Sequence, residues 1–246
     1  MMANERLRAA LLERGVTPDQ LAVAVEVDVK TIERWVTKNR TPYRRHRYAV
    51  ASFLQMEETY LWPEALSAEQ VAGASESEIL NVFPHRWTVP DDLWRRHFES
   101  AEQEIGVLVY SGLFISEDAG IQRIFRDKAD AGVRIRILLG NPDSEHVSKR
   151  GEDEGIDASM AAKIRNALVM YKPLRALDGI EFRLHDTILY NSIYRADDLV
   201  LVNTHIYGVA ASQAPVLQLR HVAGGSMVAN YLNSFERVWE GAIPLE

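Results

Sequence analysis

The chain has 246 residues, of which 47% are hydrophobic and 26% are charged. This length exceeds the usual domain size of about 100–200 residues and predicts two domains. The balance of apolar and charged residues excludes a disordered or fibrous protein. The formal net charge of -7 disfavours a protein that coats nucleic acid without specificity.

Cysteine is absent from the sequence, which excludes disulfides and thiolate metal sites. No run of about 18 apolar residues occurs, and the start of the chain lacks the cationic and apolar segments of a secretory signal. We therefore expect a cytoplasmic protein that does not enter a membrane. No His or carboxylate spacing typical of a metal site is present, so we predict neither a metal nor a cofactor.

Charge is divided unevenly along the chain. Residues 1–62 contain 10 Lys and Arg against 8 Asp and Glu, a net charge of +2, whereas the rest contains 18 against 27, a net charge of -9. The N-terminal part is therefore the better candidate for contact with DNA.

Helix signals begin at the start of the chain. Residues 4–14 place apolar side chains at spacings of three and four, and Gly15 ends this predicted helix. Thr17 and Gln20 then match a capping box, which predicts a second helix that runs to about Val25.

A third helix is predicted over residues 29–36, with Asp28 as its cap. Its spacing turns Ile32, Trp35 and Val36 inward and leaves polar residues outside. Two short helices joined by a tight turn, the second with polar residues near its N-terminus, are typical of a motif that inserts a helix into the DNA major groove.

The segment TPDQLAVAVEVDVKTIERWVTKNRTP, residues 17–42, resembles the Cro- and lambda-repressor-like (XRE-type) helix-turn-helix family. The family pattern runs Leu-Ala, a small-residue turn, an Ile-x-x-Trp recognition helix and an Arg-x-Pro exit. Two positions depart from it: Glu26 stands where glycine is frequent, and Pro18 where a phosphate-binding Gln is common. The resemblance implies an all-α helix-turn-helix domain over residues 1–66.

The same resemblance implies a set of DNA-binding residues. Lys30, Thr31 and Arg34 face base edges, and Glu33 either accepts from cytosine or pairs with Lys30. Basic residues of the exit loop and of a fourth helix, residues 44–56, would bind phosphates. The complete predicted set is Lys30, Thr31, Glu33, Arg34, Lys38, Arg40, Arg44, Arg45 and Arg47. The alternative is a helical bundle whose charged face is merely solvated.

Residues 67–88 are rich in Ala, Ser and Glu near their start and predict a partly helical connector, so the second domain is expected over residues 89–246. Its patterns predict helices that start at Asp91 and over residues 117–131, 157–171 and 226–239, and strands at 105–110, 133–139, 180–194, 199–206 and 215–222. Glu152, Asp153 and Glu154 are interpreted as a solvated acidic loop, and Asp197-Asp198 as a hairpin turn.

The order strand, helix, strand at residues 105–139 predicts a parallel pair with a right-handed crossover. The expected fold class is therefore α/β, with helices over a mixed sheet. The segments FRLHDTILYNSIYRADDLVLVNTHIYG and IRILLGNPDS resemble half of a phospholipase D-like domain, which would cover residues 100–240.

Enzymes of that superfamily carry His-x-Lys-x(4)-Asp, followed by Gly-Ser-x-Asn. Here His185 matches the nucleophile, but Thr187 occupies the Lys position and Ser192 the Asp position, and Asn203-Thr204-His205 stands near the Gly-Ser-x-Asn place. Without the lysine no fixed cation stabilises the charge that builds on phosphorus, which is typically worth a hundredfold or more in rate. We therefore expect no catalysis by the family route and no catalytic residue.

Polar residues that remain along these strands indicate a pocket that binds a ligand without turning it over. The predicted ligand-binding residues are His185, Thr187, Tyr190, Asn191, Tyr194, Arg195, Asn203, His205 and Tyr207. Asp186 is a candidate to fix the tautomer of His185. For each residue alone, a structural hydrogen bond is the alternative.

Together these features predict a dimeric, sequence-specific transcriptional regulator that binds double-stranded DNA at an inverted repeat, with a degenerate phospholipase D-like domain that senses an effector or dimerises. A phosphate-containing small molecule is the expected effector, by analogy with the fold. Two alternatives are a DNA-targeted phosphodiesterase or nuclease that uses His185, and a second domain that is purely structural.

Overall fold

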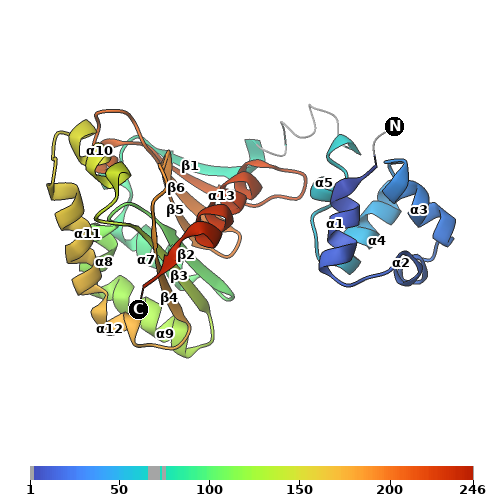
Figure 1. Ribbon diagram of the computed structural model, residues 1–246, viewed down its shortest axis with the longest axis horizontal. Helices are drawn as coiled ribbons and strands as arrows, with labels where there is room; N and C mark the ends of the chain where they lie inside the picture. The colour runs from blue at the N-terminus through green and yellow to red at the C-terminus, as the bar shows by residue number, and fades with distance from the viewer. Residues whose placement is uncertain (1–2, 66–72, 74–75, 246) are drawn as a thin grey trace. The chain divides into compact units, whose positions relative to one another are not determined.

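The structure is a computed structural model that describes residues 3–65, 73 and 76–245 (Figure 1). The chain divides into two compact units. The first comprises Met1–Ser77 and Val222–Ser226, and the second comprises Glu78–His221 and Met227–Glu246. Each unit has its own hydrophobic core.

Residues 3–65 of the first unit form helices joined by short connections. These elements are α1 (Glu5–Glu13), α2 (Pro18–Ala24), α3 (Val29–Thr37), α4 (Arg44–Leu54), α5 (Glu58–Leu61) and a 3-10 turn at Pro63–Ala65. The four helices predicted within residues 4–56 are present to within one or two residues at each end. Ile32, Trp35 and Val36 are buried, as the spacing predicted.

Side-chain caps fix where these helices begin. Thr17 and Gln20 form the predicted capping box at α2, and the Asp28 carboxylate accepts a hydrogen bond from the Lys30 backbone N–H at α3. Between the two helices Glu26 has φ +54°, a left-handed conformation in which glycine is less strained. The turn therefore has the geometry for which glycine is the usual residue, although glutamate occupies it.

The second unit is built on an eight-stranded mixed sheet. Its strands are β1 (Ile79–Phe83), β2 (Glu104–Leu108), β3 (Arg134–Gly140), β4 (Ile180–His185), β5 (Asn191–Ala196), β6 (Leu199–Thr204), β7 (Val216–Arg220) and β8 (Ile243–Pro244), in the order β1-β7-β6-β5-β2-β3-β4-β8. The pairs β2–β3 and β3–β4 are parallel and the others antiparallel. The predicted parallel strand–helix–strand unit and mixed sheet are confirmed.

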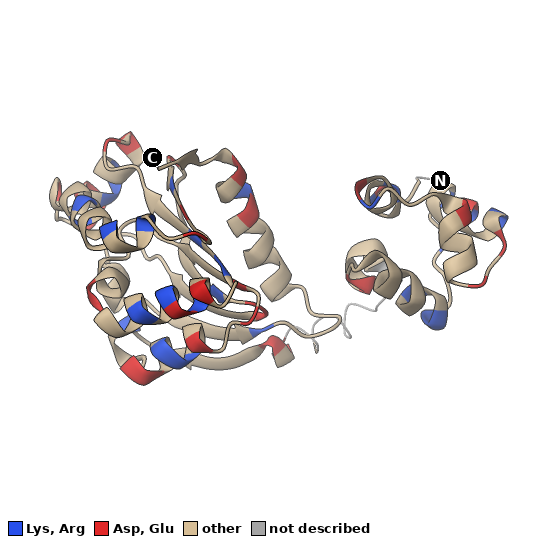
Figure 2. Ribbon diagram, turned by 90° about the horizontal axis from the view of Figure 1, so that it is seen from below, with Lys and Arg blue, Asp and Glu red and all other residues tan. Residues whose placement is uncertain are grey.

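Helices cover both faces of this sheet (Figure 1). They are α7 (Asp91–Glu99), α8 (Leu113–Glu117), α9 (Ala119–Asp130), α10 (Glu145–Asp153), α11 (Ser159–Met170), α12 (Lys172–Arg175) and α13 (Met227–Gly241), with 3-10 turns η2 (Arg86–Thr88) and η3 (Ala211–Gln213). On one face, α13 places Phe235 against Gly106 of β2. On the other face, Tyr171 at the end of α11 packs against Phe182 of β4. Lys, Arg, Asp and Glu residues occur along many of these helices (Figure 2).

Three details of this unit differ from the sequence-based prediction. The range predicted as a connector contains β1, which pairs with β7, so the sheet begins ten residues before Val89; the part at 67–72 and 74–75 lies outside the described residues. The predicted single strand at 180–194 is two strands, β4 and β5. The predicted acidic loop at 152–154 is instead the end of helix α10, where Glu154 pairs with Arg150.

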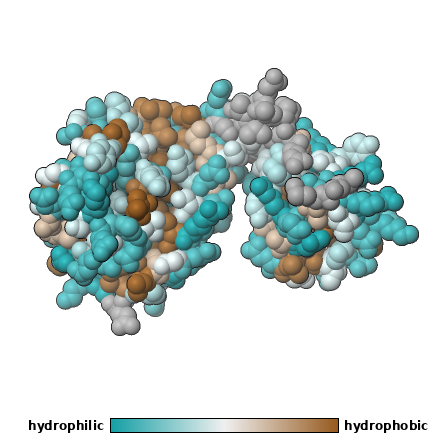
Figure 3. All heavy atoms as spheres, turned by 45° about the horizontal axis from the view of Figure 1, so that its top comes forward, coloured by the Kyte–Doolittle hydropathy of each residue, from teal (hydrophilic) through white to brown (hydrophobic). Residues whose placement is uncertain are grey.

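Asp197 forms the predicted turn between β5 and β6, and its carboxylate also accepts hydrogen bonds from the backbone N–H groups of residues 102, 103 and 104. The described helices include none that is long and apolar enough to cross a membrane. The face shown in Figure 3 is largely hydrophilic, with small hydrophobic patches on each unit.

Candidate functional site

The outer face of α3 carries the residues predicted to contact bases. Lys30, Glu33 and Arg34 are exposed and Thr31 is half-buried, while the opposite side of the helix packs into the core of the first unit. Their side chains form no ion pair within the described residues. Two positive charges on a rigid, capped helix are thus available to an anionic partner.

Basic residues also surround the exit from α3. Lys38, Arg40, Arg44 and Arg45 are exposed. Arg47 differs from them: its side chain is only 12% exposed, its Nε lies 2.5 Å from the Glu58 carboxylate, and it donates to the Pro42 carbonyl. Because Arg47 is committed to these partners, it stabilises the packing of α4 against α5 and does not offer a free guanidinium.

A groove of about 620 Å³ runs between the turn before α3 and the start of α4. Thr31, Arg34, Arg40 and Arg45 line it, together with His46, whose ring lies 5.9 Å from that of Trp35. The groove brings both predicted classes of contact, with bases and with phosphates, to one concave surface. We name this the α3 surface, formed by Lys30, Thr31, Glu33, Arg34, Lys38, Arg40, Arg44 and Arg45.

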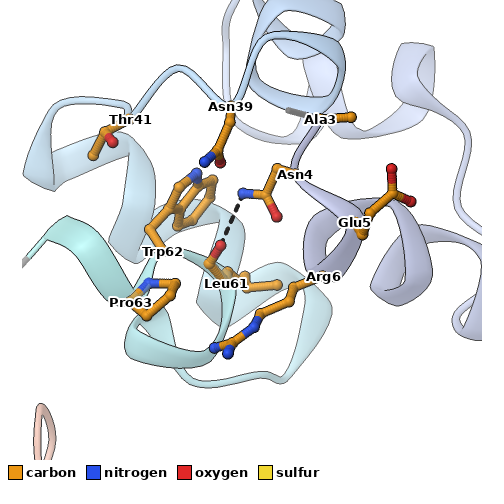
Figure 4. A pocket seen from close by; sticks show the side chains of 9 residues that line it. All are labelled: Ala3, Asn4, Glu5, Arg6, Asn39, Thr41, Leu61, Trp62 and Pro63. Carbon is orange, nitrogen blue, oxygen red and sulfur yellow. Dashed lines mark hydrogen bonds between the residues drawn. The ribbon is translucent and has the colours of Figure 1, made fainter. Parts of the chain in front are cut away.

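A second hollow of about 480 Å³ lies in the first unit between the start of α1 and the end of α5 (Figure 4). The Asn4 amide donates to the Leu61 carbonyl at 2.8 Å, and its side-chain oxygen caps α1 by accepting from the Leu7 backbone N–H. The buried indole nitrogen of Trp62 has no hydrogen-bond partner among the described residues. The contacts of Asn4 connect the start of α1 to the end of α5.

His185, the predicted counterpart of a nucleophile, is 1% exposed at the end of β4. The Thr187 backbone N–H donates to its Nδ1, so Nε2 carries the proton and donates to the Val109 carbonyl at 3.0 Å. Burial lowers the pKa of His185. Backbone groups, and not Asp186 as predicted, therefore fix its tautomer, and both ring nitrogens are occupied.

The other predicted ligand-binding residues are dispersed. Thr187, Tyr190 and Tyr207 are exposed and Asn191 is half-buried. The Asn203 side chain is fully buried and donates to the Ala214 and Pro215 carbonyls. Arg195 forms ion pairs with Glu104 and Glu236, at 2.9 and 3.4 Å. Only Tyr194 and His205 line a common cavity.

That cavity, which we name the polar pocket, measures about 90 Å³. Segments from η2 to η3 contribute to it, and most of its side chains are polar or charged. Its lining residues are Arg86, Val109, Tyr110, Ser111, Gly112, Arg150, Glu154, Met160, Lys163, Ser192, Tyr194, His205, Ala210, Ala211 and Ser212.

Hydrogen bonds hold one wall of the polar pocket in place. The Nδ1 of His205 faces the Leu189 carbonyl at 3.1 Å, so this nitrogen carries the proton and the Ser192 hydroxyl donates to Nε2 at 3.1 Å. Burial, together with the positive charges of Arg150 and Arg86, lowers the pKa of His205 to about 4. Burial also raises the pKa of Tyr194. At neutral pH both side chains are uncharged.

The cations of the polar pocket were missed by the sequence analysis. Arg86 lies in the range predicted as connector, Arg150 lies just before the predicted acidic loop at 152–154, and Lys163 lies on a predicted helix with nothing to mark it. The spacing of Arg150 and Glu154 at i and i+4 was the available signal for a helix there. Nothing local indicates that the three cations converge.

Groups of three or more His, Asp or Glu side chains that would hold a metal ion do not occur among the described residues. No protein-family model matches the chain, and no curated protein matches it.

The chain is similar to solved structures at low sequence identity. One is a phospholipase D family member, Nuc, from Salmonella typhimurium, at 16% identity and a TM-score of 0.38 over 63% of this chain and 90% of that one. Another is TrmBL2, an archaeal chromatin protein whose structure shows a novel mode of DNA binding, at 17% identity and a TM-score of 0.43 over 98% of this chain and 93% of that one. Similarity at this level assigns neither a family nor a function to the chain.

Proposed function

We propose that this chain is a sequence-specific DNA-binding transcriptional regulator, with an XRE-type helix-turn-helix domain over residues 1–66 that reads the major groove through α3. The observation that carries the proposal is the α3 surface. It combines a helix anchored by Ile32, Trp35 and Val36 with exposed Lys30 and Arg34 at its outer face. Such a helix presents donors to base edges at no cost to its own packing.

Charge around the exit loop supports the same proposal. Arg40, Arg44 and Arg45 are exposed beside the groove or at the start of α4, where guanidinium groups bind phosphates and fix the register of the protein on the duplex. Glu33 accepts from cytosine N4 or restricts which base Lys30 contacts. Arg47 is not included in this proposal, because Glu58 already holds it.

A single helix-turn-helix unit contacts one half-site, so we infer a homodimer that binds an inverted repeat with half-sites about one helical turn apart. The second unit is the proposed dimerisation or effector-binding module. We regard it as a degenerate phospholipase D-like domain, because Thr187 replaces the lysine and the Nε2 of His185 is bonded to a backbone carbonyl. A phosphate-containing small molecule is the proposed effector.

Selection of DNA from a random library by the purified full chain tests the DNA-binding proposal. Enrichment of one palindromic motif is the expected result. Arg34→Ala should weaken binding to that motif by about 10- to 100-fold, as for loss of a base contact worth about 1–3 kcal/mol. Arg45→Ala should weaken binding to all sequences alike. It should also reduce the slope of log affinity against log salt concentration by about one.

The matched control is Arg8→Ala, which removes an exposed arginine from α1 of the same unit and should leave DNA affinity unchanged. Failure to enrich any motif would overturn the proposal, and an unchanged affinity of Arg34→Ala would exclude α3 as the reading helix. Phosphodiesterase activity that is abolished by His185→Ala would replace the proposed binding role of the second unit by catalysis.

A further inference from the structure

The polar pocket holds more positive than negative charge. Arg86, Arg150 and Lys163 line it, and Glu154 is its only carboxylate. The Arg150 guanidinium lies 2.6 Å from Glu154, and these two side chains are 11% and 5% exposed. Because this pair is neutral as a whole, the charges of Arg86 and Lys163 remain uncompensated.

Neither of these two cations is paired elsewhere within the described residues. The Arg86 guanidinium carbon lies 4.2 Å from the centroid of the Phe114 ring, a cation–π contact that orients the group. Two half-buried cations beside a small cavity repel each other and are costly to hold together without an anion.

Neutral groups complete the donor set of the polar pocket. The Ser111 and Ser212 hydroxyls line it, while the Ser192 hydroxyl is already bonded to His205. Arg150 contributes further: its Nε is buried and has no partner among the described residues, although its terminal nitrogen is paired with Glu154. A buried donor without an acceptor is destabilising and rare in folded proteins. An acceptor oxygen in the cavity would satisfy it.

The size of the cavity limits what this acceptor can be. A cavity of about 90 Å³ is small, which favours a single phosphate or sulfate group over a nucleotide. Two uncompensated positive charges match an anion with two negative charges.

We propose that the polar pocket binds a phosphate-sized dianion, either free phosphate or the terminal phosphoryl group of a small monoester, through Arg86, Lys163 and the unpaired Nε of Arg150. This deepens the effector-binding part of the proposed function and rests on that part only. The three cations lie outside the degenerate motif, although Ser192 and His205, which belong to it, also line the pocket. Arg86 belongs to η2, directly after β1 at the start of the second unit, and Arg150 and Lys163 belong to α10 and α11, so the ligand would join three elements of that unit.

The test is calorimetric titration of the full chain with inorganic phosphate at constant ionic strength and without DNA. Saturable binding is expected, with Arg86→Gln and Lys163→Gln each weakening it by at least about tenfold. Arg126→Gln is the matched control, since it removes an exposed arginine of α9 that does not line the pocket. Circular dichroism checks that each variant is folded; Lys163→Gln breaks no ion pair within the described residues.

Further ligands distinguish the sources of the anion. Glycerol 3-phosphate that binds more tightly than phosphate would identify a monoester, and the reverse order would identify the free ion; dimethyl phosphate, with one charge and two extra methyl groups, should bind at least tenfold more weakly than either. Absence of saturable phosphate binding, or equal affinity in Arg86→Gln and Lys163→Gln, would overturn the inference. The DNA-selection experiment is unaffected by that failure, because it depends on α3 alone.

Discussion

The α3 surface and the polar pocket are built in opposite ways. The α3 surface comes from one short stretch, residues 30–45, and the start of its main helix, α3, is fixed by the Asp28 cap. The polar pocket gathers side chains from Arg86 to Ser212, and no two of its cations share an element. A local site can be recognised from the order of residues in the sequence, whereas a site of this second kind exists only after the sheet and its helices have assembled.

The two regions also differ in how they treat titratable groups. The α3 surface exposes its charges to solvent, while the second unit buries polar and charged groups close to the pocket. Buried groups couple folding to pH, and exposed ones do so weakly. The contrast is therefore open to a measurement of stability against pH.

We expect the largest effect from acid. Burial lowers the pKa of His97 to about 4, and that of His205 to about 4 with the help of Arg150 and Arg86. Between pH 6.5 and 4 the unfolded chain takes up protons that the folded chain does not, so stability is complete above pH 6.5 and falls as the pH approaches 4. Each histidine accounts for up to about 3 kcal/mol.

The loss of stability is measured as the free energy of unfolding in urea at pH values from 7.5 to 4.5, and calorimetry gives a second measurement. His97→Gln keeps a donor near the Tyr194 carbonyl, which His97 contacts at 3.0 Å, but cannot titrate, so it should flatten the pH dependence by about half. His205→Gln should do the same, and the double variant should flatten it further. A double variant with the full wild-type slope would show that other groups cause the acid lability.

The next effect concerns the first unit. Asn4→Ala removes both the cap of α1 and the hydrogen bond to the Leu61 carbonyl, and should destabilise this unit by about 2 kcal/mol. Asn4→Asp is the matched variant, since it keeps the capping oxygen and loses only the amide donor, and should cost less. Hydrogen exchange of peptides from each unit measures the loss, which should be confined to residues 3–65. Equal exchange in Asn4→Ala and the wild type would contradict the role given to Asn4.

Much of the fold was predictable because its signals are local. Thr17, Gln20 and Asp28 mark helix starts by side-chain chemistry, and the run at residues 105–139 is long enough to specify a parallel strand–helix–strand unit. β1 was missed because its side chains are mostly exposed and it forms an edge strand, so its residues show no buried pattern. Its pairing with β7 depends on a contact more than 130 residues away in the chain.

The two candidate sites differ in the same way: one has local sequence signals, and the other depends on contacts between distant residues. The sequence predicted nine DNA-binding residues from one local stretch, and eight of them form the α3 surface; the ninth, Arg47, is paired with Glu58, eleven residues away. In the second unit only Tyr194 and His205 of the predicted ligand-binding residues line the polar pocket. Alternation along strands predicts which face of the sheet a residue occupies. It does not predict whether the polar atoms of that residue are hydrogen-bonded to a neighbouring loop or to a backbone carbonyl, as those of His185 are.

The smallest expected effect isolates the turn before α3. Glu26 has φ +54°, a conformation in which a residue with a Cβ is strained. Glu26→Gly should therefore stabilise the first unit by about 1 kcal/mol, and the greater entropy of glycine in the unfolded chain should reduce this gain. Asn39 at φ +46° is the matched comparison: asparagine tolerates this conformation, so Asn39→Gly should change stability by less. Thermal unfolding of the two variants measures the difference. If Glu26→Gly were no more stable than Asn39→Gly, interactions of the Glu26 side chain would have to offset the strain of its backbone. The glutamate would then stabilise the turn before α3, and would not merely be tolerated in place of glycine.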